Sequence, residues 1–220
     1  MLCCAQIIAS LLLTPRFAHH STVVNATGHS APHLYSSLGL VSPTLPAPPR
    51  HYFARGNYFK LSSPTSLRPI VNGLVYPVPK ADLSGLGIHA TIGVDGGVKF
   101  GPDVDWLDPT VSEPDDDFYS VDEAKIEDLK AKFSSAIKNY IPSFSEFGEL
   151  QYDYAGVRPK LNHPDAREGD FDGGGDFWIR QDSVGFINLF GIESPGVTSS
   201  LAIGEEVIKM IDKRNIMKSL

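Results

Sequence analysis

The sequence predicts an α+β fold in which a mixed or antiparallel sheet with a flanking helix occupies the middle of the chain. Strand-type residues recur in short stretches between Gly, Pro and Asp turns. The 20 Gly and 17 Pro are typical of many turns rather than of a helical bundle. Helical periodicity is confined to two segments, and the 220 residues are enough to bury a core in one large domain or two small ones.

The predicted strands are short and are separated by turn residues. They cover residues 23–26, 52–61, 74–78, 87–92, 98–100, 150–154, 177–180 and 186–190. Asp95-Gly96 indicates a hairpin between two of these strands. The Pro-rich residues 42–50 are predicted to be an irregular connector, and residues 108–117 an acidic loop.

Two helices are predicted from apolar spacing. The first, over residues 120–140, has an apolar face at three- and four-residue intervals: Ile126, Leu129, Phe133, Ile137 and Tyr140. Ser120 and Glu123 have the spacing of a capping box at its start. The second runs from about residue 199 to 213, with Leu201, Gly204, Val207, Ile208 and Ile211 expected to face the core.

Composition and motif searches exclude several functional classes. The formal net charge of −7 argues against nucleic acid as a partner. No apolar run approaches the roughly 18 residues of a membrane-spanning helix. With Cys3 and Cys4 as the only cysteines, a disulfide scaffold and a thiolate zinc site are both excluded. Asp170, Asp172 and Asp176 resemble a calcium loop, but Gln181 stands at the closing position, so no metal is expected.

Residues 186–205 carry the most informative pattern. A buried strand is predicted to enter a turn rich in Gly, Ser and Thr that opens directly onto a helix. A helix start has unpaired N–H groups and a partial positive charge, so such a turn suits an anionic or strongly accepting group. Gly191 and Gly196 have phosphate-loop spacing, but Val197 stands where the lysine is needed, and no Gly-x-Gly-x-x-Gly is present. A plain strand–loop–helix connection with polar caps stays open as the alternative.

Three further side chains have chemistry suited to a site. Arg158 and Lys160 are two residues apart and share one face if the predicted strand at 150–154 continues through them, and a guanidinium there could hold a carboxylate. His89 alternates with the apolar Ile88 and Ala90, so it faces away from them and could serve as a general base. Solvated surface charges and a structural histidine are the alternatives for these positions.

Seven stretches occur in an order that resembles one known family. They are residues 23–28 (VVNATG), 55–59 (RGNYF), 75–79 (VYPVP), 87–91 (GIHAT), 100–103 (FGPD), 156–160 (GVRPK) and 191–204 (GIESPGVTSSLAIG). Together they resemble the carboxyl-terminal half of D-amino-acid-oxidase-like (glycine-oxidase-like) FAD-dependent oxidoreductases, specifically those members that oxidise L-2-hydroxyglutarate. The resemblance begins near residue 22 and extends to the end of the chain, and the last stretch is its most specific part.

The resemblance implies a role for each matching residue. FAD would be contacted by Thr27 and Gly28 after the first strand and by the turn, through Gly191, Ser194, Gly196, Val197, Thr198 and Ser199. The helix start after this turn would face N1 and the C2 carbonyl of the flavin, where reduced flavin carries negative charge. Tyr76 and His89 would line the substrate pocket, with His89 as the base. Arg158 and Lys160 would bind a dicarboxylate substrate.

The resemblance also implies a division of the chain and an expected activity. Residues 22–50 would be a remnant of a Rossmann-like FAD-binding domain with its linker, 51–150 the substrate-binding domain, and 151–220 the strands and helix that cover the flavin. Residues 1–21 are unassigned and do not resemble the ADP-binding half, so the chain is expected to lack that half. Its Rossmann-like domain would therefore be incomplete, represented at the carboxyl end by a strand–helix piece.

The expected reaction is oxidation of L-2-hydroxyglutarate to 2-oxoglutarate by hydride transfer to flavin N5. The alternatives are an amino-acid or sarcosine-type oxidase and a truncated, non-catalytic remnant. The resemblance suggests a mitochondrial address, although no clear transit peptide is present. The electron acceptor and the oligomeric state are left open.

Overall fold

The computed structural model describes residues 22–38, 46–62, 70–78, 87–111, 118–162, 165, 176–182 and 185–218. Cys3, Cys4, Asp170 and Asp172 lie outside these ranges, as do parts of the predicted connector and acidic loop. The chain divides into two compact units, and each is described by itself. Unit 1 takes the described residues of Met1–Phe53, Asp108–Pro114 and Arg158–Leu220, and unit 2 those of Ala54–Leu107 and Asp115–Val157.

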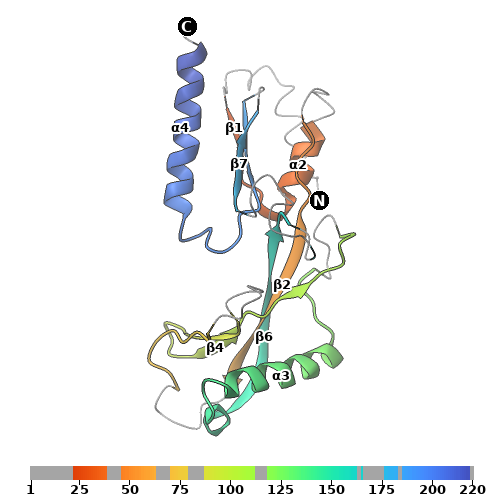
Figure 1. Cartoon of the computed structure of the whole chain (residues 1–220), viewed down its shortest axis with the longest axis vertical. Helices are drawn as coiled ribbons and strands as arrows, with labels where there is room; N and C mark the ends of the chain where they lie inside the picture. Colours follow the sequence, from red (N-terminus) through yellow and green to blue (C-terminus); the bar gives the residue numbers. More distant parts are fainter. Residues whose placement is uncertain are drawn as a thin grey trace. The chain divides into compact units, whose positions relative to one another are not determined.

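Unit 1 is built on a three-stranded sheet (Figure 1). Its elements are β1 (Val23–Asn25), the 3-10 helix η1 (Gly28–Ser30), α2 (Ala31–Leu38), β7 (Trp178–Gln181), β8 (Phe186–Phe190) and α4 (Ser200–Lys218). The strand order is β1-β8-β7, with β1 parallel and β7 antiparallel to the central strand β8. A parallel neighbour is necessarily distant along the chain, because two parallel strands need a long crossover connection.

The helix α2 covers one face of this sheet. Ala31 and Tyr35 from α2 are buried with Phe186 and Phe190 from β8, and Leu161 completes the cluster. The guanidinium of Arg180 on β7 lies over three aromatic rings in the same region, those of Tyr35, Trp178 and Phe190, at 5.0, 4.9 and 5.5 Å from the ring centroids. Each aromatic face attracts the cation electrostatically, and this compensates part of the cost of partly burying Arg180.

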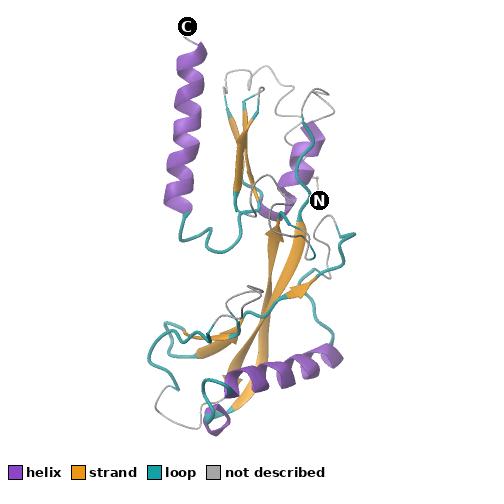
Figure 2. Cartoon of the chain, viewed as in Figure 1, coloured by secondary structure: helices purple, strands orange, loops and turns teal. Residues whose placement is uncertain are grey.

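Unit 2 contains a five-stranded sheet and the long helix α3 (Figure 2). Its elements are β2 (Tyr52–Ser62), β3 (His89–Ile92), β4 (Val98–Gly101), β5 (Asp105–Trp106), α3 (Glu123–Lys138), the 3-10 helix η2 (Phe144–Phe147) and β6 (Glu149–Lys160). The strand order is β3-β4-β2-β5, and β6 pairs with β2 off this path. The strands β3, β4 and β5 are each antiparallel to their neighbours on the path.

The core of unit 2 lies between this sheet and α3, which crosses one face of β2 and β6 (Figure 1). Phe59, Ala90 and Phe100 from three strands are fully buried against Phe133 and Ile137 of α3. The predicted apolar face of this helix is confirmed, since Leu129 is also buried and Ile126 and Tyr140 pack at its margin. The predicted hairpin is confirmed as well, with Gly96 at φ +80°.

The prediction of mixed strands and helices is confirmed, but two local expectations are wrong. Residues 74–78 form a single bridge between Val75 and Ala90, because Pro77 has no N–H with which to continue a ladder. The capping box fails because α3 begins at Glu123 with Asp122 as its N-cap, two residues after Ser120. The helix α2 was not predicted.

The expected core face of α4 is also wrong in part. Val207 is buried, but Leu201 is 84% exposed and Ile208 is 58% exposed. The apolar residues of α4 are distributed around the helix, so their spacing does not select one face. None of the helices in the described part of the chain is both long and apolar enough to span a bilayer.

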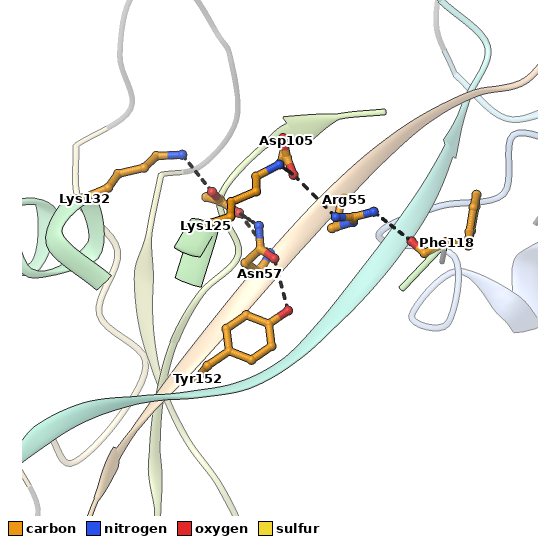
Figure 3. Close-up of polar contacts among 8 residues, drawn as sticks. Arg55, Asn57, Asp105, Phe118, Lys125, Lys132 and Tyr152 are labelled. Carbon is orange, nitrogen blue, oxygen red and sulfur yellow. Dashed lines mark hydrogen bonds and ion pairs between the residues drawn. The ribbon is translucent and has the colours of Figure 1, made fainter. Parts of the chain in front are cut away.

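A buried polar network fixes β2 within unit 2 (Figure 3). The backbone N–H and the side-chain Nδ2 of Asn57 both donate to Asp103 Oδ1 at 2.9 Å, and Lys132 of α3 donates to Asp103 Oδ2 at 2.7 Å. Tyr152 of β6 donates its hydroxyl to Asn57 Oδ1 at 3.3 Å. Asn57 is fully buried and Asp103 is 5% exposed, so water competes little for the hydrogen bonds between them. The Lys132 side chain that links Asp103 to α3 is half exposed.

We expect Asp103→Ala to lower the free energy of unfolding by about 2–4 kcal/mol, because two buried Asn57 donors would lose their acceptor. Asp128→Ala, on the exposed side of α3, is the matched control and should cost less than about 0.5 kcal/mol. Urea unfolding followed by circular dichroism measures both. Equal losses for the two variants would contradict a structural role for the network.

Candidate functional site

The segment after β1 is folded over a buried asparagine. Asn25 is 1% exposed, and its Oδ1 accepts hydrogen bonds from the hydroxyl of Thr27 at 2.8 Å and from its backbone N–H at 3.4 Å. Its Nδ2 donates to the carbonyl of Ala31 at 2.9 Å. Gly28, with φ +61°, lies between these contacts in a conformation that favours glycine. The predicted cofactor residues Thr27 and Gly28 are therefore held in a turn of fixed shape.

A second asparagine joins this turn to β8. Asn188 lies directly opposite Asn25 in the parallel register and is fully buried, and its Oδ1 accepts from Asn25 Nδ2 at 3.0 Å. The carboxyl ends of β1 and β8 are thereby tied at one edge of the sheet, and ligands of open α/β sheets bind at that edge. Neither residue was predicted from the sequence to belong to the site, although the Asn inside the apolar run FINLF was an available signal for Asn188.

The start of the turn from Gly191 to Ser199 is held by a close contact with Leu161 and a hydrogen bond with His51. Gly191 has φ +65°, and a Cβ added there would lie 2.6 Å from Cγ of Leu161. Its N–H donates to Nε2 of His51 at 3.2 Å. His51 is 3% exposed and lies edge-on to Phe53 and Phe190. The start of the turn is therefore fixed by a side chain 140 positions earlier in the sequence.

The rest of the turn closes on itself. The N–H of Gly196 donates to the carbonyl of Glu193 at 2.5 Å, and a Cβ at Gly196 would lie 2.6 Å from that same oxygen. The backbone N–H and the hydroxyl of Ser199 both donate to the carbonyl of Pro195, at 2.9 and 2.8 Å. The turn therefore has one compact conformation, from which α4 begins at Ser200.

Adjacent backbone donors near the end of this turn are available to a ligand. Among the described residues, the N–H groups of Val197 and Thr198 have no acceptor, and both residues are exposed. They precede the first turn of α4, where the helix dipole adds partial positive charge. Adjacent donors of this kind suit the N1 and C2-carbonyl edge of a flavin, so this donor set fits the expected cofactor.

The two predicted substrate cations lie at the end of β6, in unit 1. Val157 and Pro159 are buried, and Arg158 and Lys160 between and after them are partly exposed, which agrees with the predicted shared face. The amino group of Lys160 forms an ion pair with Glu193 of the turn at 2.6 Å. The structure thus joins a predicted substrate residue to the predicted flavin turn, and the charge of Lys160 is already balanced.

The predicted base His89 and its neighbour Tyr76 lie in unit 2 and stack on each other. Their ring centroids are 4.4 Å apart with an interplanar angle of 24°. Ile88 and Ala90 are buried in the core, so His89 points to the opposite face of the sheet, as the alternation predicts. That face is therefore turned away from the core of unit 2.

The surroundings of His89 favour the neutral imidazole. Partial burial lowers its pKa, and the contact between Nδ1 and the carbonyl of Gly87, 3.2 Å away, opposes this only in part. Donation from Nδ1 to that carbonyl would leave Nε2 as the unprotonated nitrogen, which is the form that a general base needs.

The same face of the sheet continues with aromatic and basic side chains. Gly101 pairs with His89 across β3 and β4, and a Cβ at Gly101 would lie 2.8 Å from the ring of Tyr58. Tyr58 in turn stacks on Tyr154, with centroids 4.6 Å apart. Lys99 lies 5.0 Å from the centre of the Tyr154 ring and pairs with Asp153.

In the part of the chain that is described, no group of His, Cys, Asp and Glu could hold a metal ion.

Comparisons with known proteins identify the family of the chain. Residues 9–210 match the family described as DAO, FAD dependent oxidoreductase. The mitochondrial L-2-hydroxyglutarate dehydrogenase of Arabidopsis thaliana is 41% identical over 189 residues, which are 84% of this chain and 36% of the plant protein. L-2-hydroxyglutarate dehydrogenase of Escherichia coli K12 is 27% identical over 214 residues, 87% of this chain and 47% of that protein.

A solved structure shows the same fold. The dithionite-reduced L-α-glycerophosphate oxidase of Mycoplasma pneumoniae with FAD bound superimposes with a TM-score of 0.60 and 22% identity, and covers 87% of this chain and 42% of its own. The chain therefore spans less than half the length of each of these relatives.

We expect the buried His51 to make stability depend on pH. Burial lowers its pKa from 6.5 to about 4, and a contact with the His29 backbone opposes this shift. Between pH 6.5 and 4 the unfolded chain binds a proton at this position and the folded chain does not, so the stability fully present above pH 6.5 falls as the pH is lowered. The loss reaches about 3 kcal/mol at pH 4.

Urea unfolding at a series of pH values measures this effect as the difference between the wild type and His51→Gln. The stability advantage of the wild type over the variant should shrink steadily from pH 6.5 to 4. His33→Gln, at an exposed position of α2, is the control for loss of an imidazole away from Gly191. Parallel profiles for the wild type and His51→Gln would overturn the expectation.

Proposed function

The chain belongs to the family of FAD dependent oxidoreductases, and we propose that it takes part in the oxidation of an L-2-hydroxy acid, specifically of L-2-hydroxyglutarate to 2-oxoglutarate. The observation that carries this proposal is the turn from Gly191 to Ser199, which presents two adjacent backbone donors at the start of α4. The names of the Arabidopsis and Escherichia coli relatives supply the substrate.

The residues present divide the work on the cofactor in unit 1. Thr27 and Gly28 would contact the flavin after β1, and the N–H groups of Val197 and Thr198 would stabilise negative charge at its pyrimidine edge. When bound, the flavin supplies a hydride acceptor at N5. The parallel pairing of β1 and β8 supports an interpretation of this sheet as part of a Rossmann-like FAD domain.

On the substrate, His89 would take the proton from the 2-hydroxyl group, because its imidazole is held neutral. Tyr76, stacked on it, would fix the orientation of the imidazole plane. Arg158 would bind a carboxylate of the substrate through its guanidinium. Lys160 would contribute less to substrate binding, because its charge is balanced by Glu193. Removal of the C2 hydrogen as hydride and of the hydroxyl proton leaves the 2-oxo acid.

Two other functions differ from this one in ways that can be measured. An amino-acid or sarcosine-type oxidase on the same fold would act on an amine in place of the hydroxyl. A non-catalytic remnant would bind a diacid without turnover. The plant relative is named as mitochondrial, and we propose the same address for this chain.

The purified chain, mixed with FAD and freed of unbound cofactor, should show the visible bands of bound flavin. Anaerobic addition of L-2-hydroxyglutarate should bleach them with formation of one 2-oxoglutarate per flavin, because the flavin accepts both electrons. D-2-hydroxyglutarate and sarcosine are the matched control substrates. Bleaching by sarcosine alone would assign an amine oxidase, and bound flavin that no substrate reduces would favour the remnant.

His89→Gln should slow flavin reduction by about 10²–10⁴-fold at pH 8 while the affinity for L-2-hydroxyglutarate is kept, because general-base catalysis contributes that much. Arg158→Ala should instead raise KM with a smaller change in kcat, since the guanidinium binds substrate and transition state alike. Stopped-flow flavin reduction separates the two effects. An unchanged reduction rate in His89→Gln would place the base elsewhere.

A further inference from the structure

We propose that His51 and Lys160 are positioning residues that hold the turn from Gly191 to Ser199 in the shape that presents its donors. The proposal rests on the assignment of this turn to the flavin. The two residues anchor different points of the turn, His51 at Gly191 and Lys160 at Glu193. Neither anchor is close in sequence to the turn.

The first anchor acts on the backbone where β8 ends. Phe190 is fully buried and ends β8, and the next residue, Gly191, turns the chain in a conformation with φ +65°. The N–H of Gly191 would be a buried donor without a strand partner, and Nε2 of His51 accepts it at 3.2 Å. The His51 ring is itself fixed edge-on between Phe53 and Phe190, with centroids 6.3 Å away in each case.

The chemistry of this contact requires one form of the imidazole. An N–H donor needs an acceptor, so Nε2 must be unprotonated and the ring hydrogen must lie on Nδ1. Burial holds His51 neutral at physiological pH, which agrees with that requirement. The titratable group that faces the ring from another element is His29 of η1. A glutamine can place an amide oxygen near the position of Nε2, whereas a leucine fills the volume and offers no acceptor.

The second anchor acts two residues further on. The carboxylate of Glu193 is 13% exposed and the amino group of Lys160 lies 2.6 Å from it. The carbonyl of the same Glu193 accepts the N–H of Gly196, which closes the turn just before Val197. A displacement of Glu193 would therefore move the two donor groups of Val197 and Thr198. This assigns Lys160 to the cofactor side of the site and leaves substrate binding to Arg158.

Amide hydrogen exchange of the full chain, measured by mass spectrometry without added cofactor, tests the anchors directly. His51→Leu should speed exchange in the peptide covering residues 191–199 at least tenfold, and His51→Gln should restore the wild-type rate. Lys160→Met should speed exchange at residues 193–196 and leave Gly191 slow. Peptides from α3, in unit 2, serve as the control for global unfolding and should be unchanged in every variant.

An unchanged exchange rate at residues 191–199 in His51→Leu overturns the proposal. If His51→Leu does not fold, His51→Asn takes its place, because its shorter amide cannot reach Gly191. The exchange rate of residues 191–199 is then compared between His51→Asn and His51→Gln, and equal rates overturn the proposal. Addition of FAD gives the second readout. With bound flavin, the midpoint potential should fall in His51→Leu and return in His51→Gln. If the exchange results are as expected but the chain does not bind FAD, the proposed function is wrong and the positioning role of His51 and Lys160 stands.

Discussion

The hydrogen bond between the side-chain amides of Asn25 and Asn188 is the interaction on which unit 1 depends. It joins the carboxyl ends of two parallel strands that lie 163 positions apart in the sequence. On one side, the remaining atoms of Asn25 fold the segment that contains Thr27. On the other, β8 continues into the turn at Gly191. Because both amides are buried, loss of the Asn25 amide would leave Oδ1 of Asn188 without its hydrogen-bond donor and without water.

Unit 2 uses buried polarity for the same purpose, which is to fix elements that apolar packing alone would leave free to slide. Asp103 binds both donors of Asn57 and the amino group of Lys132, so β2 and α3 have one register relative to each other. Apolar contacts have no direction, whereas hydrogen bonds do. With the core face fixed in this way, the opposite face of the sheet presents His89, Tyr76 and the stacked pair of Tyr58 and Tyr154.

Much of the secondary structure was predictable because its signals are local. The spacing of Leu129, Phe133 and Ile137 predicted α3, and the alternation around His89 predicted which side chain leaves the core. The single bridge at Val75 and the helix α2 were not predicted, since a Pro beside a strand-type run and a short helix with Pro32 near its start give weak patterns. In α4, apolar residues around the whole helix concealed the face that is buried.

The family, the cofactor class and the turn between β8 and α4 could be predicted from the sequence, because they depend on residue types in a fixed local order. The contacts that hold that turn could not. The contacts of His51 with Gly191 and of Lys160 with Glu193 join positions that are distant along the chain. No local pattern records such a contact, because it exists only once the strands have paired and brought the two segments together.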